Sequence, residues 1–287
     1  MAEVGSPLVQ RRRLRTELKK ARQTSGLTQD QVAGEMDWSM SKIIRIEAGS
    51  SGISANDLKA LLQLYGVKDP GQVDSLLALA RVARERSWWS SYRDVAPQPL
   101  LQLIEYESAA QVIRQFENEF VPGILQTEDY AHAVLDNYYE EELGVDQLRA
   151  LVDLRTRRQD LIDAENPPSF HFVLDEAVVR RLVVGPSVMR RQLRRLIEVA
   201  GKPNVTLELI PFSVGLHPGM KGPFEIIEFA DPSVSDTVYL ESPRGDIFSD
   251  APEETSKYIE AFDKLKKASL GSQGSLARIA KIADEMS

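Results

Sequence analysis

Apolar positions recur at helical spacing through the first third of the chain. Together with candidate cap residues, this spacing predicts five helices, over residues 11–23, 29–36, 39–48, 54–65 and 72–86. Residues 1–8 show no such spacing and are expected to be disordered. Pro97 and Pro99 break the chain further on, so the boundary with a second domain is expected between residues 70 and 99.

Two hydrophobic periods are mixed beyond residue 99. Helical spacing continues first, and alternation typical of strands follows after Pro167-Pro168. The expected helices are 100–116, 128–139, 146–164, 176–182, 187–200, one starting at Pro252, and 275–286. The expected strands are 170–174, 205–210, 224–229 and 237–240. The sequence therefore predicts an all-α N-terminal domain (1–68), a helical junction (69–99) and a larger α+β domain (100–287).

Residues 28–49 carry strong helix start and stop signals. Thr28 is a favoured N-cap, and Gln31 three residues later completes a capping box. Ser39 offers a second N-cap, and Gly49 is a natural C-terminal glycine. The stretch predicts two short helices joined by a tight turn.

The outer surface of the second of these helices is polar and basic. Its expected members are Ser39, Met40, Ser41, Lys42 and Arg45. Such a surface can meet DNA, because arginine donates two hydrogen bonds to guanine and methionine offers apolar contact to a thymine methyl. The same composition is also typical of an ordinary solvated helix face.

At these residues the chain resembles the XRE helix-turn-helix family, which includes the lambda and 434 repressors. The resemblance rests on Thr28-Gln29, on Ala33 and on the ending Arg45-Ile46-Glu47-Ala48-Gly49. It implies a lambda repressor-like domain whose second helix lies in the major groove of double-stranded DNA.

The resemblance also implies roles for individual residues. Ser39 would begin the recognition helix, and Gln29 would contact a phosphate. Arg22 and Glu47 match positions that pair in the family, so both are expected to be structural. The residues expected to read bases or face the groove are Met40, Ser41, Lys42 and Arg45. Met40 departs from the glutamines common in the family, which leaves the sequence preference open.

Charge is divided unevenly along the chain. The formal net charge is -8, yet residues 1–68 hold 11 Lys and Arg against 7 Asp and Glu, a balance of +4. The remainder holds 24 against 36, a balance of -12. A basic module ahead of an acidic body suits a protein that meets phosphates with one end.

Cysteine is absent and long apolar runs are missing. Without cysteine, disulfide scaffolds and thiol zinc sites are excluded, which fits a reducing cytoplasm. No apolar run reaches about 18 residues, and the first 20 residues lack a signal-peptide core. We expect a cytoplasmic protein that does not enter a membrane.

Catalytic motifs are also missing. The histidines His132, His171 and His217 are isolated, so no H-E-x-x-H zinc site can form. No GxSxG elbow, phosphate-binding loop or dinucleotide fingerprint is present. The acids at 140–142 are expected to be solvated. We expect no enzyme, no cofactor and no metal, with an unrecognised catalytic domain as a remote alternative.

A second resemblance covers the C-terminal part. The chain resembles WhiJ-like, actinobacterial antitoxin-type regulators, in which an XRE motif precedes a large domain of unknown function. The residues that carry it are Trp88-Trp89, Glu105, Ala109, Val121-Pro122-Gly123-Ile124-Leu125-Gln126-Thr127 and Tyr130-Ala131. It implies a bacterial transcriptional regulator, often encoded beside a small partner protein.

These observations predict a homodimeric DNA-binding regulator whose C-terminal domain dimerises and binds a small partner protein. A metabolite sensed by that domain is the alternative. The loops 215–223 and 242–246 are either ligand-pocket walls or plain turns. The arginine-rich helix 146–164 is expected to be an exposed, salt-bridged face, because acids alternate with its arginines.

Overall fold

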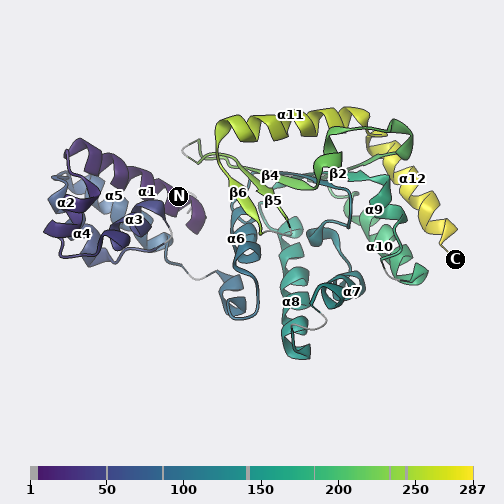
Figure 1. The fold of residues 1–287 in the computed structure, drawn as a ribbon, viewed down its shortest axis with the longest axis horizontal. Coiled ribbons are helices and arrows are strands. Elements are labelled where there is room, and N and C mark those ends of the chain that lie inside the picture. The colour runs from purple at the N-terminus through teal and green to yellow at the C-terminus, as the bar shows by residue number, and fades with distance from the viewer. Residues whose placement is uncertain are drawn as a thin grey trace. The chain divides into compact units, whose positions relative to one another are not determined.

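The computed structural model describes residues 6–49, 51–85, 87–139, 143–183, 185–232, 234–242 and 245–286. The chain divides into two compact units, with the division along the sequence between Trp88 and Trp89. The N-terminal unit is all-α, and the C-terminal unit combines helices with a mixed sheet (Figure 1), as the sequence predicted. The acids at 140–142 lie outside the described residues.

The N-terminal unit is a bundle of five helices among the described residues. They are α1 (Pro7–Thr24), α2 (Gln29–Glu35), α3 (Met40–Ala48), α4 (Ala55–Leu64) and α5 (Pro70–Val82). Pro7 opens α1, because proline suits the first turn of a helix, so the expectation of disorder was wrong for residues 7 and 8. The core of the bundle is built from Leu18, Val32, Ile43, Leu58, Leu61 and Leu62.

The C-terminal unit is built on a six-stranded sheet of order β3-β2-β1-β4-β5-β6. Its strands are β1 (Val112–Glu117), β2 (Ser169–Asp175), β3 (Val205–Ile210), β4 (Phe224–Glu228), β5 (Thr237–Leu240) and β6 (Ile247–Ser249). The strands β1, β2 and β3 are parallel, whereas β4, β5 and β6 add antiparallel pairs.

The main correction concerns residues 100–116, which were predicted as one helix. Helix α6 spans Gln98–Glu107 and stops, and residues 112–117 form β1, which lies between β2 and β4. The segment Val-Ile-Arg-Gln-Phe-Glu combines β-branched and aromatic residues with alternating burial, which suits a strand. The four strands expected from the sequence were therefore too few, since the described residues form six.

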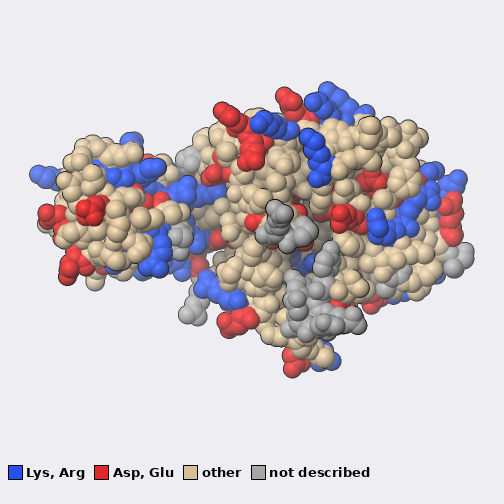
Figure 2. All heavy atoms as spheres, viewed as in Figure 1, with Lys and Arg blue, Asp and Glu red and all other residues tan. Residues whose placement is uncertain are grey.

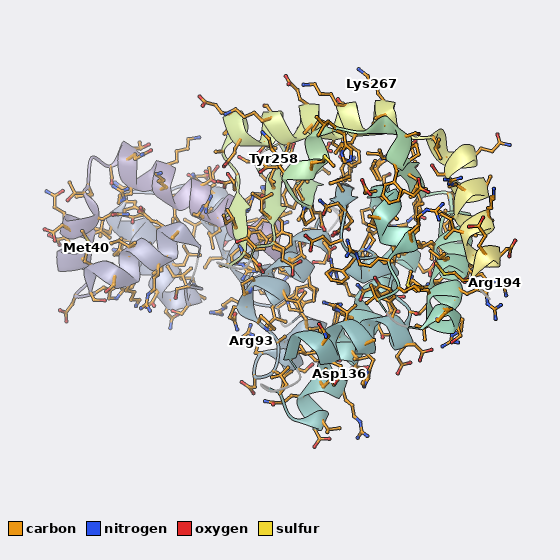
Figure 3. The ribbon with its side chains drawn as sticks, turned by 45° about the vertical axis from the view of Figure 1, so that its right-hand side comes forward. Met40, Arg93, Asp136, Arg194, Tyr258 and Lys267 are labelled. Atoms are coloured by element: carbon orange, nitrogen blue, oxygen red, sulfur yellow. The ribbon has the colours of Figure 1, made fainter. Side chains whose placement is uncertain are left out.

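Helices cover both faces of the sheet (Figure 1). They are α7 (Glu128–Tyr139), α8 (Val145–Arg158), α9 (Glu176–Arg180), α10 (Pro186–Val199), α11 (Pro252–Ala268) and α12 (Gly271–Glu285). Helix α11 packs Phe262 and Leu265 on Phe116, Phe224 and neighbouring apolar residues of one face. In Figure 3, Lys267 on the same helix points outward to solvent.

Successive side chains of each strand point to opposite faces of the sheet, so the second face is lined by the residues that alternate with those under α11. Its apolar half presents Ile113, Phe170, Phe172, Leu174 and Leu207 to α7, α10 and α12. The other half of this face carries the polar residues Gln115 on β1, Glu225 on β4 and Tyr239 on β5. That polar half is the floor of a cavity described below.

Candidate functional site

The turn between α2 and α3 is held by backbone and cap hydrogen bonds. The Thr28 side chain and Gln31 form the predicted capping box. The Trp38 N–H donates to the Ala33 carbonyl at 2.9 Å, and Asp37 takes a left-handed conformation with φ 51°. Aspartate tolerates this region better than most residues, which lets the chain turn sharply without glycine.

Helix α3 begins and ends where the sequence predicted. The Ser39 side chain accepts the Lys42 N–H at 3.3 Å, and Gly49 ends the helix with φ 75°. Ser39, Met40, Ser41 and Arg45 are exposed. Met40, with 40% of its surface accessible, lies on the outer side of the bundle in Figure 3.

Ile44 also lies on the outer face of this helix. Ile43 and Ile46 are buried, whereas 46% of the surface of Ile44 is exposed. The core side of α3 is completed by Glu47 instead, which is buried. One residue along a helix rotates the side chain by about 100°, so Ile43 and Ile44 cannot both face the core squarely. Ile44 therefore joins the outer face as a residue that the sequence interpretation missed.

Lys42 has two neighbours that fix its position. Its Nζ lies 3.1 Å from Asp57 Oδ2, near the start of α4, and 3.6 Å from the centroid of the Trp38 ring. These contacts place the ammonium at the edge of the α3 outer face. The charge of Lys42 is thus partly balanced within the domain.

Arg22 and Glu47 form the predicted structural pair. Arg22 donates to Glu47 at 2.6 and 3.1 Å and to the Leu27 carbonyl at 2.8 Å. Gln29 donates to Glu47 at 2.8 Å, so its amide helps to tie α2 to α1 and α3. A phosphate contact from Gln29 stays a prediction. This network of hydrogen bonds fixes the orientation of α3 relative to α1 and α2.

Both signs of charge occur on the N-terminal unit. Figure 2 shows Lys and Arg on its visible face with Asp and Glu among them. The excess of positive charge in residues 1–68 is therefore distributed rather than gathered in one uniform patch on that face.

A second candidate site is a cavity of about 340 Å³ in the C-terminal unit. Its floor is the polar half of the sheet, where Gln115 on β1 lies opposite Glu225 on β4, and Glu225 lies opposite Tyr239 on β5. Glu117, two residues beyond Gln115, points to the same side. Apolar walls come from Leu103, Phe120, Val134, Leu135 and Leu151.

Two arginines of α8 reach the cavity. Arg158 is buried and donates two hydrogen bonds of 2.5 Å to Glu107 at the end of α6. Arg155 donates to the Gln126 side chain at 2.7 Å. The prediction of an exposed salt-bridged face was therefore wrong for this side of α8, because the carboxylate that pairs with Arg158 comes from a distant, buried position.

The stretch 121–127 closes the cavity. Gln126 donates to the Val121 carbonyl at 2.8 Å, and Gln192 donates to the Leu125 carbonyl at the same distance. A Cβ at Gly123 would lie 3.2 Å from Arg158 Nη1, so glycine allows the close approach of the guanidinium. The Thr127 hydroxyl accepts the Tyr130 N–H at 3.4 Å and so caps α7.

No described residue donates a hydrogen bond to Glu225, an acid of the cavity floor. Neither carboxylate oxygen of Glu225, which is 1% exposed, receives a hydrogen bond from a donor among the described residues, and Gln115 Oε1 receives none either. Burial, the charge of Glu107 and a hydrogen bond that the protonated Glu225 makes to Glu107 raise the pKa of Glu225 well above its usual range. Burial, with Glu241 nearby, raises the pKa of Glu117 to about 8.

Two family models match the chain, one over each unit. A family model described as Domain of unknown function (DUF5753) matches residues 100–281, more than half of the chain. The chain belongs to this family. A model described as Helix-turn-helix domain matches residues 13–76, which supports a DNA-binding regulator. No curated protein and no solved structure matches.

The DUF5753 match covers the sheet and every residue that lines the cavity except Pro97 and Pro99. Of the two loops singled out in the sequence, 242–246 contributes Gly245 and Asp246 to the lining. Residues 243 and 244 of that loop lie outside the described residues. The loop 215–223 contributes only Pro223.

The sequence interpretation missed the cavity of the DUF5753 domain, although a signal was present. Buried strands normally carry apolar residues at every inward position, and Gln115, Glu117 and Glu225 break that rule. The misassignment of β1 as helix hid the alternation. Within the described ranges, no helix is long and apolar enough to cross a bilayer, and no cluster of metal-ligating side chains occurs.

Proposed function

We propose that the protein is a sequence-specific, DNA-binding transcriptional regulator of the XRE type, acting in the bacterial cytoplasm, with α3 as the recognition helix. The observation that carries the proposal is the exposed face of α3, which two cap residues and the Arg22–Glu47–Gln29 network hold at the surface. Gln29, Ser39, Met40, Ser41, Lys42 and Arg45 are the proposed DNA-binding residues, with Ile44 added.

Selection of binding sites from a random DNA pool tests this role. The parent protein should enrich one motif, and Arg45→Ala should lose roughly 1–3 kcal/mol on that motif and relax one base position. Lys68→Ala, which removes an exposed charge in the loop after α4, is the matched control. Equal enrichment by Arg45→Ala and the parent would contradict the groove assignment.

We infer that the C-terminal domain dimerises the protein or binds a small partner protein, as the resemblance to WhiJ-like antitoxin-type regulators implies. An exposed apolar loop supports this role: Phe212, Val214, Leu216 and Met220 all lie on it, and Leu216 is 91% exposed. Large exposed apolar groups gathered on one segment often mark an interaction site.

Sensing of a metabolite by the same domain is the second candidate, and the cavity supports it. Its volume lies in the range of small-molecule sites, and it combines apolar walls with a few polar groups. Neither candidate requires catalysis, and we propose none.

A further inference from the structure

We propose that the cavity of the C-terminal domain binds a small organic cation: a primary amine or guanidinium group carried on a short hydrocarbon chain. The inference deepens the sensing candidate and rests on it only for a regulatory meaning. The site itself is argued from the cavity alone.

The balance of charge around the cavity favours a cation. Among the described residues, the lining contains the acids Glu117, Glu225, Glu241 and Asp246 and the bases Arg155 and Arg158. Arg158 is already paired with Glu107 by two hydrogen bonds, so this pair adds no net charge. Four acids and one base, Arg155, then remain in the described lining, so the acids outnumber the bases even when two of the acids hold protons.

In the cavity lining, the buried polar atoms that lack a partner among the described residues are acceptors. Both oxygens of Glu225 and the Gln115 Oε1 receive no hydrogen bond there, although their residues are at least nine-tenths buried. Because the two residues lie opposite each other on β4 and β1, their acceptors converge on one region of the cavity floor. An ammonium offers three N–H donors and no acceptor, and a guanidinium offers five.

The apolar walls define the rest of the ligand. Leu103 from α6 and Leu151 from α8, together with Val134 and Leu135 from α7, line the cavity away from the sheet. A hydrocarbon chain of a few carbons can contact these side chains while its charged end meets Glu225. A cavity of about 340 Å³ is at the lower end of the range for small-molecule sites, which suits a small cation.

Binding should release protons. The carboxyl of Glu225 faces Glu107 from α6, Glu117 from β1, Tyr239 from β5, Arg158 from α8, and Glu241 and Asp246 at the rim. Burial and neighbouring acids raise the pKa of Glu117 to about 8 and also raise the pKa of Glu225, so the cavity holds an acid proton at neutral pH. An arriving cation favours the carboxylate, so the acid proton passes to solvent while the cation keeps its own protons.

Calorimetric titration of the full-length protein tests the proposal. Pentylamine and butylguanidine are the cationic probes, 1-pentanol is the neutral isostere and pentanoate is the anion. We expect only the cations to bind, with a heat that changes between buffers of different ionisation enthalpy because protons are released. The affinity of the cations should rise between pH 6 and pH 8.

Two variants place the binding in the cavity. Glu225→Gln keeps the shape but removes the anion, and Asp246→Asn, at the partly exposed rim, serves if the first variant does not fold. Either substitution should weaken the binding of pentylamine at least tenfold, which corresponds to about 1.4 kcal/mol. Glu260→Gln removes an exposed carboxylate on α11 and should change nothing.

Four results would each overturn the proposal. They are 1-pentanol binding as tightly as the cations, pentanoate binding more tightly than the cations, neither cation binding, and both cavity variants binding pentylamine as the parent does. The titration contains no DNA, so such a failure leaves the helix-turn-helix role intact. Conversely, a failure of the DNA selection leaves the cavity result intact.

Discussion

Glu107 and Arg158 are the most deeply buried ion pair described in the C-terminal domain, with side chains 1% and 6% exposed. Removing one partner of such a pair leaves the other charge without compensation in a medium of low polarity. The pair also joins the end of α6 to α8 beside the cavity. Its contribution to stability is therefore tied to the integrity of the cavity wall.

Arg158→Met should destabilise the C-terminal domain by about 3–5 kcal/mol, because Glu107 stays buried and unpaired. Thermal or urea unfolding monitored in this domain measures the loss. Arg149→Met, on the same helix, is the control, since Arg149 pairs with Asp146 on the open surface and should matter little. Comparable unfolding curves for the two variants would show that the buried pair is not structural.

Glu117 predicts a pH dependence of stability. Its pKa is raised from 4.5 to about 8 by burial first and then by Glu241, so the folded protein holds a proton that the unfolded chain releases above pH 4.5. The contribution of this proton to stability is complete below pH 4.5 and is lost as pH rises toward 8. Glu117→Gln lacks the ionisable group and should not show this loss.

The midpoint of thermal unfolding should therefore fall more between pH 5 and pH 8 for the parent than for Glu117→Gln. In a domain of this size, each kcal/mol corresponds to about 2–4 °C. Parallel pH profiles for the two proteins would mean that Glu117 ionises normally in the folded state.

At the scale of elements, the sequence predicted α2 and α3 well and β1 poorly. Thr28, Ser39 and Gly49 act through local hydrogen bonds and backbone conformation, which depend on neighbours in sequence. Residues 112–117 form a strand because they pair with β2 and β4, which lie far away along the chain. Short apolar segments are ambiguous until such partners are known.

The two candidate sites differ in the same respect: one depends on local sequence and the other on contacts between distant segments. The exposed face of α3 was predictable because a single helix supplies it. The cavity was not, because Gln115, Glu225 and Arg158 come together only in the folded domain. The stretch 121–127, by resemblance, and the loops 215–223 and 242–246, by composition, were the parts of the lining singled out beforehand, and the hydrogen bonds of 121–127 now give that stretch a physical role.

The short helix η5 (Pro218–Lys221) predicts a further mutational effect. Gly219 is buried against β1, and a Cβ there would overlap the ring of Phe116. Gly219→Ala should therefore destabilise the C-terminal domain by about 1–3 kcal/mol through overpacking. Gly34→Ala in α2, where a Cβ meets nothing within 4 Å, should instead stabilise its own domain by about 0.5–1 kcal/mol. Unfolding measurements with the opposite order of effects would contradict this packing.

At the scale of the whole molecule, a DNA-binding unit is joined to an acidic domain with an exposed apolar loop. A dimer would let two copies of α3 enter successive major grooves roughly 34 Å apart on an inverted repeat. A ligand or partner would regulate DNA affinity only by binding two states of that dimer unequally.

Leu216→Asp tests the apolar loop as an association surface. The variant should lower the molar mass measured by light scattering, or abolish capture of a small partner protein, because an aspartate cannot be buried cheaply in an apolar contact. Lys267→Asp, an exposed change on α11, is the control. Unchanged association in Leu216→Asp would exclude this loop as the interface.

Genome-wide recovery of DNA crosslinked to the native protein tests DNA recognition by α3 most directly. The parent and Lys68→Ala should recover the same inverted repeat, with half-sites about one helical turn apart, and Arg45→Ala should lose it. Recovery of the same sites by Arg45→Ala, or no enriched motif with the parent, would contradict recognition through this helix.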